Sequence, residues 1–388
     1  MKVRTRVARS RFLASVLACA MLSACGGCGG GDPTTPPVTA TIPRVVTLNA
    51  SLSSPWGLAF LPDGRMLVTQ KGGTMVVLAA DGASVQATVS GLPAVVSDGQ
   101  GGLLDVALDP DFATDPFVYW TYSEPGTGAE AGLSGTAVAR GRLVGSALQD
   151  VAVLYRQAPK VSGSGHFGAR LAFRGDGTLF VTLGERQKGS PAQDISTTLG
   201  KVIRIRRDGT IPSDNPGIPG ARPEIWSSGH RNPQGAAIRP GTDELWVDEH
   251  GPQGGDELNR IAPGGNHGWP LVSYGCNYGD PVGDSCRIGG GTHAPRFVEP
   301  VAFWGPTSIA PAGLVFYTGA RFPAWQGNAF MGALAGKALW RVELRGDVEV
   351  ARERLLGGLG ERIRDVEQGP DGFLYLLTDG GKLLQLRD

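Results

Sequence analysis

The sequence predicts an all-β fold, a single six-bladed β-propeller over residues 43–388. Its 388 residues include 60 glycines and 28 prolines, and runs of helix-forming residues are missing after residue 25. A short apolar strand, a turn built on Pro, Asp and Gly, and a second apolar strand recur along the chain. These repeats begin at Gly57, Val106, Leu171, Ala236, Leu314 and Val366. Each repeat unit spans about 55–60 residues, the size of a four-stranded blade with loops, which favours a propeller over a sandwich or an irregular barrel.

The N-terminus is typical of an export signal. Residues 1–24 carry five basic residues, followed by an apolar run from Phe12 to Leu22 that is too short to span a membrane. The ending Leu-Ser-Ala-Cys resembles a bacterial lipobox, which implies cleavage before Cys25 and lipid on its sulfur; the alternative is an ordinary signal peptide. Residues 25–42 are predicted to form a flexible tether. We therefore expect a lipid-anchored protein on the periplasmic side of a bacterial membrane, which contacts the membrane only through its anchor.

Charge and cysteine content narrow the function further. The whole chain balances 36 basic against 36 acidic residues, and loss of the five basic leader residues leaves a net charge of −5. A mildly acidic protein argues against nucleic acid as a partner. Only Cys276 and Cys286 lie in the globular part, and an exported compartment permits a disulfide between them.

Polar residues concentrate between Gly229 and Trp269, in loops on either side of a predicted strand over Glu244–Val247. Loops at the ends of rigid strands are where binding and catalytic groups gather. Most of the polar loops of the chain precede the first strand of a repeat, so we expect them at the same end of the propeller. One of them carries His166, a candidate general base, although a lone histidine is more often structural.

Two further sets of residues indicate ligands. Arg231, Lys337, Arg362 and Arg364 lie on equivalent loops, and if they converge they require an anion, for which arginine favours planar carboxylates. The acidic residues Glu249, Asp256 and Glu257, with the carbonyls of Gly251 and Pro252, form an oxygen-rich set. Oxygen ligands on a glycine-rich loop suit Ca²⁺, with an ordinary acidic turn as the alternative.

Seven segments in this order resemble the PQQ-dependent soluble glucose dehydrogenase and aldose sugar dehydrogenase family of six-bladed propellers. They read PWGLAFLPDGRMLVT, DGQGGLLDVALDPDF, HFGARLAFRGDGTLFVTLGER, GHRNPQG, EHGPQGGDELN, GGNHGWP and RIRDVEQGPDGFLY. The resemblance covers about residues 45–386. Its EHGPQGGDE segment is more similar to the aldose sugar dehydrogenase branch.

The resemblance implies a role for each matching position. His166 is expected to remove the proton from the C1 hydroxyl of an aldose while hydride passes to PQQ, giving a lactone. The residues expected to hold or surround PQQ are Gln100, Arg231, Asn232, His250, Asp256, Ser308, Lys337, Arg362 and Arg364. The carbonyls of Gly251 and Pro252 are expected to bind the Ca²⁺ that also ligates PQQ, and Glu257 with the His267 carbonyl a second, structural Ca²⁺.

The chain departs from the family pattern at a few of these positions. His267 stands where the family often has Tyr, and Gly165 stands where the glucose dehydrogenase branch has an Asp that would orient the base. Two other functions fit a six-bladed propeller: a non-enzymatic binding module, and a calcium-dependent lactonase, which needs carboxylates around a central metal. The sugar and the electron acceptor are not set by these motifs.

Overall fold

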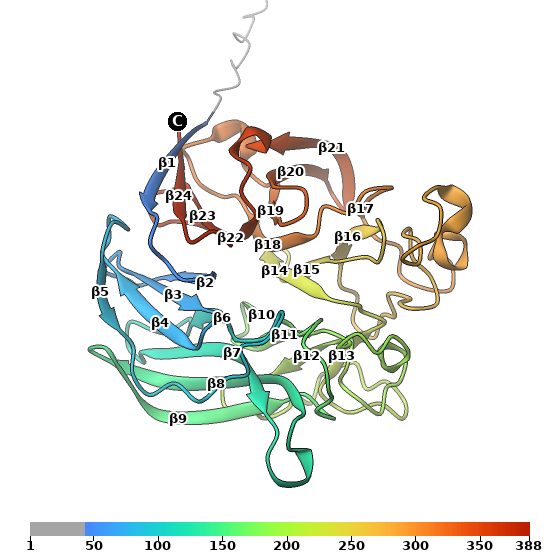
Figure 1. The fold of residues 1–388 in the computed structure, drawn as a ribbon, viewed down its shortest axis with the longest axis horizontal. Coiled ribbons are helices and arrows are strands. Elements are labelled where there is room, and N and C mark those ends of the chain that lie inside the picture. The colour runs from blue at the N-terminus through green and yellow to red at the C-terminus, as the bar shows by residue number, and fades with distance from the viewer. Residues whose placement is uncertain (1–42) are drawn as a thin grey trace, which may run out of the picture. The chain divides into compact units, whose positions relative to one another are not determined.

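The computed structural model describes residues 43–388, and these form six four-stranded antiparallel sheets arranged in a ring around a central axis (Figure 1). The predicted six-bladed β-propeller is therefore confirmed. The leader, the lipidation site Cys25 and the tether lie outside the described residues. No helix in residues 43–388 is long and apolar enough to cross a membrane.

Each predicted repeat corresponds to one blade, whose first strand lies nearest the axis. The first three blades are β2 (Pro55–Phe60), β3 (Met66–Gln70), β4 (Thr74–Leu78) and β5 (Val85–Thr88); β6 (Leu103–Leu108), β7 (Phe117–Pro125), β8 (Ser134–Val144) and β9 (Ala147–Arg156); and β10 (Gly168–Phe173), β11 (Leu179–Leu183), β12 (Lys201–Ile205) and β13 (Ile225–Ser228). The fourth and fifth are β14 (Pro233–Arg239), β15 (Glu244–Glu249), β16 (Asp256–Arg260) and β17 (Ala302–Trp304); and β18 (Pro311–Phe316), β19 (Ala329–Ala333), β20 (Ala338–Arg345) and β21 (Val348–Leu355).

The sixth blade joins the two ends of the described chain. Its strands are β22 (Ile363–Gln368), β23 (Leu374–Thr378), β24 (Leu383–Arg387) and, on the outer edge, β1 (Arg44–Asn49). Figure 1 shows β1 lying along β24 beside the C-terminus, with Arg44 opposite Arg387 in the register. The sequence did not predict this closure, in which β1 completes a blade made otherwise of the last repeat.

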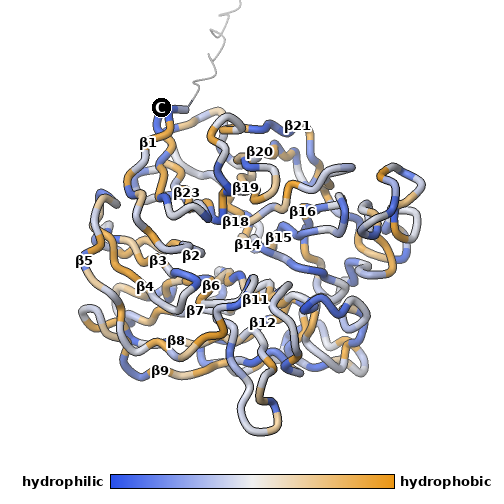
Figure 2. The backbone as a smooth tube through the Cα atoms, in the orientation of Figure 1, coloured by the Kyte–Doolittle hydropathy of each residue, from blue (hydrophilic) through white to orange (hydrophobic). Residues whose placement is uncertain are grey.

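The hydrophobic core is divided among the six interfaces between neighbouring blades. Each interface has its own buried cluster, such as Leu67 and Trp120 between the first two blades, and Leu58 and Leu377 between the last and the first. In Figure 2 the strands of the blades carry the apolar segments, while the long loops are mostly polar. This arrangement explains why apolar residues recur with the repeat, since every blade must bury both faces.

Three buried threonines link successive inner strands. The hydroxyl of Thr121 accepts a hydrogen bond from the amide of Asp105 at 2.9 Å and donates to the carbonyl of Ala169 in the next blade at 2.7 Å. Thr69 and Thr182 do the same: each accepts an amide of its own blade and donates to a carbonyl of the next blade. Each such hydroxyl therefore fixes the spacing of two blades around the axis.

The strand predicted over Glu244–Val247 is too short. β15 continues through Asp248 and Glu249, because these residues keep the antiparallel pairing with Gly235 and Pro233 of β14. The remaining short elements are 3₁₀ turns at Gly128–Glu130, Ser190–Ala192, Asp284–Cys286, Ile288–Gly290, Pro323–Trp325 and Gly357–Leu359.

Candidate active site

The predicted site residues gather at one end of the ring, where the inner strands begin. Gln100, His166, Arg231 and Ser308 precede β6, β10, β14 and β18, and Arg362 precedes β22. Adjacent strands are antiparallel, so the loops after β15 and β19 reach the same end, as the pairing of Pro233 with Glu249 shows. The expectation of a shared end is therefore confirmed.

His166 is buried at this end and is paired with a carboxylate. Its side chain lies against Glu185, with 2.6 Å between Nδ1 and Oε1, and Glu185 also accepts the amide of Gly189 at 2.6 Å. Burial lowers the pKa of His166, and the hydrogen bond to Glu185 opposes that shift. The result is an imidazole held in one orientation, with Nε2 as its remaining nitrogen.

Sequence reasoning missed Glu185. It expected the residue that orients His166 at position 165, where this chain has a glycine. Glu185 directly follows β11, the strand paired with β10, so the ladder between these strands brings it to His166. The backbone of His166 has a φ of +51°, a conformation that non-glycine residues adopt rarely and that His tolerates better than most. The side chain of Gln100 accepts the His166 amide at 2.8 Å.

Gln100, Asn232 and His250 form a hydrogen-bonded group next to this histidine. Asn232 is fully buried, and its amide nitrogen lies 3.4 Å from both Gln100 Oε1 and His250 Nδ1. His250 Nε2 lies 2.8 Å from the carbonyl of Pro311 and must donate to it, so Nδ1 is the acceptor. Burial and the neighbouring Arg231 lower the pKa of His250 to about 3, which keeps its ring neutral.

Several cations line the same end with too few carboxylates to balance them. Asp379 binds both Arg362 and Arg364, at 2.8 and 2.9 Å. Lys71, in the loop after β3, donates to the carbonyl of Gly99 at 2.6 Å. Burial, and then the guanidinium of Arg364, lower the pKa of Lys71, so these cations lie within each other's field. Lys71 and Asp379 were both missed, because each lies beside a Gly-Gly pair after the second strand of its blade, which the sequence alone presents as an ordinary turn.

Arg231 is the fourth of these cations and is 6% exposed. Its guanidinium nitrogens lie 3.3 Å from the carbonyl of His250 and 3.3 Å from the hydroxyl of Tyr278, while its buried Nε has no hydrogen-bond partner among the described residues. Together Lys71, Arg231, Arg362 and Arg364 form what we call the cationic rim. A buried donor without an acceptor is costly, so the rim is suited to an anionic ligand.

The loop from Gly251 to Gly255 is held in place by Asp256 and Ser308, two of the residues that the resemblance implies around PQQ. Asp256 is buried, and its carboxylate accepts the amides of Gly251 at 2.8 Å, Ile309 at 2.5 Å and Ala310 at 2.8 Å. Ser308 donates to the carbonyl of Pro252 at 3.2 Å and accepts the amide of Gly254 at 2.9 Å. Both side chains therefore orient the loop whose carbonyls are the predicted calcium ligands.

The three acidic residues of the predicted oxygen-rich set do not converge on one point. Glu249 binds His230 Nδ1 at 2.8 Å and the Arg231 amide at 2.6 Å, whereas Asp256 faces backbone amides. Within residues 43–388, no three His, Cys, Asp or Glu side chains are grouped so as to hold a metal. Asp256 points away from the other two because neighbouring residues of a strand point to opposite faces, whereas Glu249 and Glu257 are cross-strand partners on one face.

Glu257 and His267 nevertheless lie together, beside a small cavity that Glu249 and His293 also line. Burial, and then Glu249, raise the pKa of Glu257 well above its ordinary range. The ring of His267 is buried and stacks on His230 with 4.6 Å between centroids. A buried carboxylate beside a second one, with a 3.3 Å contact to His293 Nε2, is an environment that a cation would stabilise.

Two predicted features, Lys337 and the disulfide, lie at the edge of the site. Lys337 is exposed, in the turn between β19 and β20 at the same end as the rim, with φ of +45°. Cys276 and Cys286 form the predicted disulfide, with 5.1 Å between their Cα atoms. The disulfide closes a loop that carries Tyr278, whose hydroxyl contacts Arg231. Sequence reasoning missed Tyr278.

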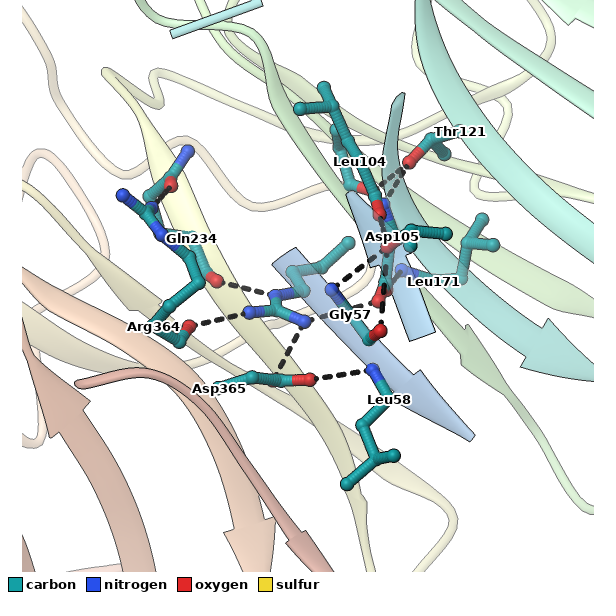
Figure 3. Close-up of polar contacts among 12 residues, drawn as sticks. Gly57, Leu58, Leu104, Asp105, Thr121, Leu171, Gln234, Arg364 and Asp365 are labelled. Atoms are coloured by element: carbon teal, nitrogen blue, oxygen red, sulfur yellow. Dashed lines mark hydrogen bonds and ion pairs between the residues drawn. The ribbon is translucent and has the colours of Figure 1, made fainter. Parts of the chain in front are cut away.

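A second buried charge cluster lies on the axis, on the inner strands β6, β10 and β22. Arg170 lies 3.1 Å from Asp105 and 2.8 Å from Asp365, and we call these three residues the axial cluster. Arg170 also donates to the carbonyls of Gln234 at 2.7 Å and Arg364 at 3.0 Å. Figure 3 shows Asp105 of β6, Gln234 of β14, and Arg364 and Asp365 of β22 close to one another. The cluster thereby supports the backbone of one rim residue.

The site thus combines a buried His–carboxylate pair, a candidate base, with an excess of positive charge that suits an anionic ligand. A sequence profile of the Glucose / Sorbosone dehydrogenase family matches residues 52–385. The chain therefore belongs to the glucose/sorbosone dehydrogenase family, a family of oxidoreductases. The predicted family and the predicted enzyme class are confirmed.

Individual relatives agree with this assignment. The chain is 45% identical over 350 residues to the aldose sugar dehydrogenase YliI of Escherichia coli, covering 88% of this chain and 92% of that protein. The structure is similar to that of the soluble aldose sugar dehydrogenase from Escherichia coli in its apo-form, with a TM-score of 0.81 and 44% identity, over 89% of this chain and 99% of the other.

A PQQ-bound form of the aldose sugar dehydrogenase from Streptomyces coelicolor is also similar, with a TM-score of 0.71 and 31% identity, over 89% of this chain and 98% of that one. Quinoprotein glucose dehydrogenase B of Acinetobacter calcoaceticus is 27% identical over 414 residues, covering 87% of this chain and 86% of that protein. The family assignment excludes neither of these branches. Because the family is one of oxidoreductases, the assignment argues against a non-enzymatic binding module and against a lactonase.

Proposed function

We propose that this protein oxidises aldose sugars at C1 to the lactone, with PQQ as the acceptor and Ca²⁺ as a further cofactor. The observation that carries the proposal is the position of His166, a buried neutral base next to the cationic rim. Neither the buried histidine nor the rim stabilises the protein by itself, because the histidine is desolvated and the charges of the rim are unbalanced. The names of the relatives support the substrate class and the cofactor.

The rim fits PQQ, a planar quinone with three carboxylates. In the rim, Arg362 and Arg364 share the carboxylate Asp379, and Lys71 lies within their field. Arg231 has a buried Nε without an acceptor among the described residues. Guanidinium groups bind planar carboxylates in pairs of parallel hydrogen bonds. Gln100, Asn232 and His250 supply neutral polar groups beside these cations, and Lys337 lies at the exposed edge. When bound, PQQ would supply the acceptor for the hydride that leaves C1.

In this proposal His166 accepts the proton of the C1 hydroxyl at Nε2 as the C1–H bond breaks. Nδ1 is occupied by Glu185, so Nε2 is the nitrogen left for the sugar. Burial keeps His166 unprotonated near neutral pH, which is the state that a general base requires. Glu185 stabilises the imidazolium formed by the transfer, and Gln100 holds the backbone of the base through its amide.

Calcium fits two places in this site. The carbonyls of Gly251 and Pro252 lie on a loop that Asp256 and Ser308 already hold in place, so binding there would require little reorganisation. At the second place the ligands would be Glu257 and the carbonyl of His267, beside the small cavity described above. A divalent cation there would reverse the rise in the pKa of Glu257 that burial produces.

Reconstitution of the purified protein tests the proposal. We expect PQQ added with Ca²⁺ to bind and to support aldose oxidation with an artificial electron acceptor, and prolonged EGTA treatment to abolish both. Glu257→Ala should mainly lower the melting temperature in Ca²⁺, by loss of native-state ligand binding. PQQ that binds without supporting oxidation of any aldose, or full turnover after EGTA, would contradict the substrate or the metal respectively. The physiological electron acceptor is a separate question.

We also propose that the mature protein is attached to a membrane by lipid on Cys25, on the periplasmic side. The support for this is the lipobox-like ending of the N-terminal segment. Mass spectrometry of the mature wild-type protein should find a lipidated N-terminal Cys25, and Cys25→Ser should release the protein from the membrane fraction. A mature protein that begins at another residue and carries no lipid would refute the anchor.

A further inference from the structure

Tyr278 is an exposed aromatic residue at the edge of the site, with 71% of its surface accessible. Its hydroxyl lies 3.3 Å from a guanidinium nitrogen of Arg231, and its ring centroid lies 5.9 Å from the Arg231 Cζ. Trp269 lies on the same guanidinium, with 5.2 Å to its ring. Tyr278 therefore directs its polar end to the rim and leaves most of its ring open to solvent.

The loop that carries Tyr278 is fastened to the loop of the predicted calcium ligands. Gln253 and Cys276 exchange both backbone hydrogen bonds, each 3.0 Å long. The side chain of Gln253 adds contacts to Gly279 at 3.2 Å and to Asp280 at 3.3 Å. The Cys276–Cys286 disulfide closes the same loop at its base. A loop with this many attachments holds an exposed ring in a defined place, which a free surface residue would not need.

We propose that Tyr278 forms a wall of the aldose-binding site and that the disulfide-closed loop 276–286 determines which sugars are accepted. This inference rests on the proposed function. A pyranose has an apolar C–H face and a rim of hydroxyls, and the open face of a tyrosine ring matches the apolar face. Tyrosine provides such a surface at a low cost in side-chain entropy. The ring stands next to Arg231 and therefore beside the cofactor site, where C1 must lie.

The cofactor itself is a poorer match for Tyr278. An anionic quinone requires cations and hydrogen-bond donors, which the rim provides without this residue. The hydroxyl of Tyr278 is already directed to Arg231, so the part that stays available is the apolar ring. Loss of the ring is thus expected to affect the sugar far more than PQQ.

The test compares Tyr278→Ala and Tyr278→Phe with Val282→Ala, an exposed position on the same loop, in protein loaded with PQQ and Ca²⁺. For Tyr278→Ala we expect the KM for glucose to rise about five- to tenfold, the effect of one lost stacking contact, with kcat and PQQ affinity within about twofold. Tyr278→Phe keeps the ring and should keep the KM, as should Val282→Ala. The double variant Cys276→Ser/Cys286→Ser should raise the KM in the same direction by a smaller factor, because the Gln253 contacts remain.

Maltose and galactose, measured alongside glucose, report on selectivity. We expect the ratio of their kcat/KM values to change in Tyr278→Ala and to stay constant in Val282→Ala. An unchanged KM and ratio in Tyr278→Ala, or a loss of PQQ affinity with no change in KM, would overturn the inference.

Calorimetry of glucose binding to the same proteins separates this inference from the proposed function. If the wild type binds glucose but does not oxidise it, the proposed oxidation is wrong. Weaker glucose binding by Tyr278→Ala would then still support a sugar-binding role for Tyr278. If the wild type does not bind glucose, maltose or galactose, the inference is wrong.

Discussion

The cationic rim and the axial cluster use similar side chains and meet at β22, yet they are balanced differently. In the axial cluster one guanidinium, Arg170, is shared by two carboxylates, Asp105 and Asp365. In the rim one carboxylate, Asp379, is shared by two guanidiniums, with Lys71 nearby. Arg364 and Asp365 are neighbours in β22 and belong to opposite groups. The surplus charge of the axial cluster is negative, and burial raises the pKa values of Asp105 and Asp365, so protons can balance it. The surplus of the rim is positive and sits mainly on arginines, which keep their protons, so the rim requires an anion from outside.

This difference predicts that substitutions in the rim alter ligand binding or turnover, while substitutions on the axis alter folding stability. Buried charges without a partner are expensive, so an unbalanced group persists where function requires it. The variants below test this division in order of decreasing expected effect.

His166→Gln should cause the largest change. Glutamine keeps a polar side chain of similar size but cannot accept the proton, and general-base catalysis typically contributes about 10²–10⁴-fold. We expect turnover to fall by that factor while PQQ affinity, measured by titration of the PQQ-free protein, stays within about threefold. Turnover within threefold of wild type would show that His166 is not the base.

Arg170→Met should lower stability more than any rim substitution. Removal of one partner from a buried ion pair costs about 3–5 kcal/mol, because Asp105 and Asp365 are left without a cation. Burial already raises the pKa of Asp365 to about 6 and that of Asp105 above its ordinary value. A carboxyl whose folded pKa exceeds its unfolded one destabilises the fold as pH rises through that interval. Urea unfolding should therefore show a larger deficit at pH 8 than at pH 5; an equal deficit at both would contradict the assignment.

Arg364→Ala should show the reverse pattern. Hydrogen bonds to charged groups contribute about 1.5–3 kcal/mol, so we expect PQQ affinity to fall about 10–100-fold. The urea midpoint of the PQQ-free protein should change little, because Arg362 keeps its contact with Asp379. Arg65→Ala removes an exposed ion pair in the turn between β2 and β3 and serves as the control. Equal loss of PQQ affinity in both variants would argue against a specific rim.

Glu185→Gln should have the smallest effect on turnover, about tenfold, with a change in its pH dependence. The carboxylate raises the pKa of His166 against the effect of burial, so its removal lowers that pKa. The acid limb of kcat/KM, where His166 becomes protonated, should move to lower pH. A limb that moves to higher pH, or does not move, would mean that Glu185 does not act on the base.

The sequence predicted the fold because the repeat is local: each blade has two apolar strands joined by a turn built on Pro, Asp and Gly, with Asp-Gly or Pro-Gly in four of the six. It missed β1, because Arg44–Asn49 carries no turn or motif that relates it to a repeat 320 or more residues away. The pairing of β1 with β24 depends on ring closure, which is a property of the whole chain.

The same reasoning explains the site. His166, Arg231 and Arg362 precede inner strands and Arg364 lies at the start of one, and that regular placement made them visible. Glu185, Lys71 and Asp379 instead follow the second strand of their blades, β11, β3 and β23. Nothing in the sequence around them marks them as site residues, and only the closed ring brings them to the site. The predicted acidic set was read from adjacency along the chain, whereas side chains on paired strands alternate between faces.

The closure by β1 and β24 also sets the order in which the protein is completed. Each of the first five blades is contiguous in sequence, so it has all its strands as soon as its own segment has been synthesised. The sixth blade takes its outer strand from the beginning of the chain and its other three from the end. β1 must therefore wait, with its hydrogen-bonding edge unmatched, until Leu383–Arg387 has emerged. A chain stopped shortly before its C-terminus would lose the ring as a whole, whereas the same number of residues removed from a surface loop would leave it closed.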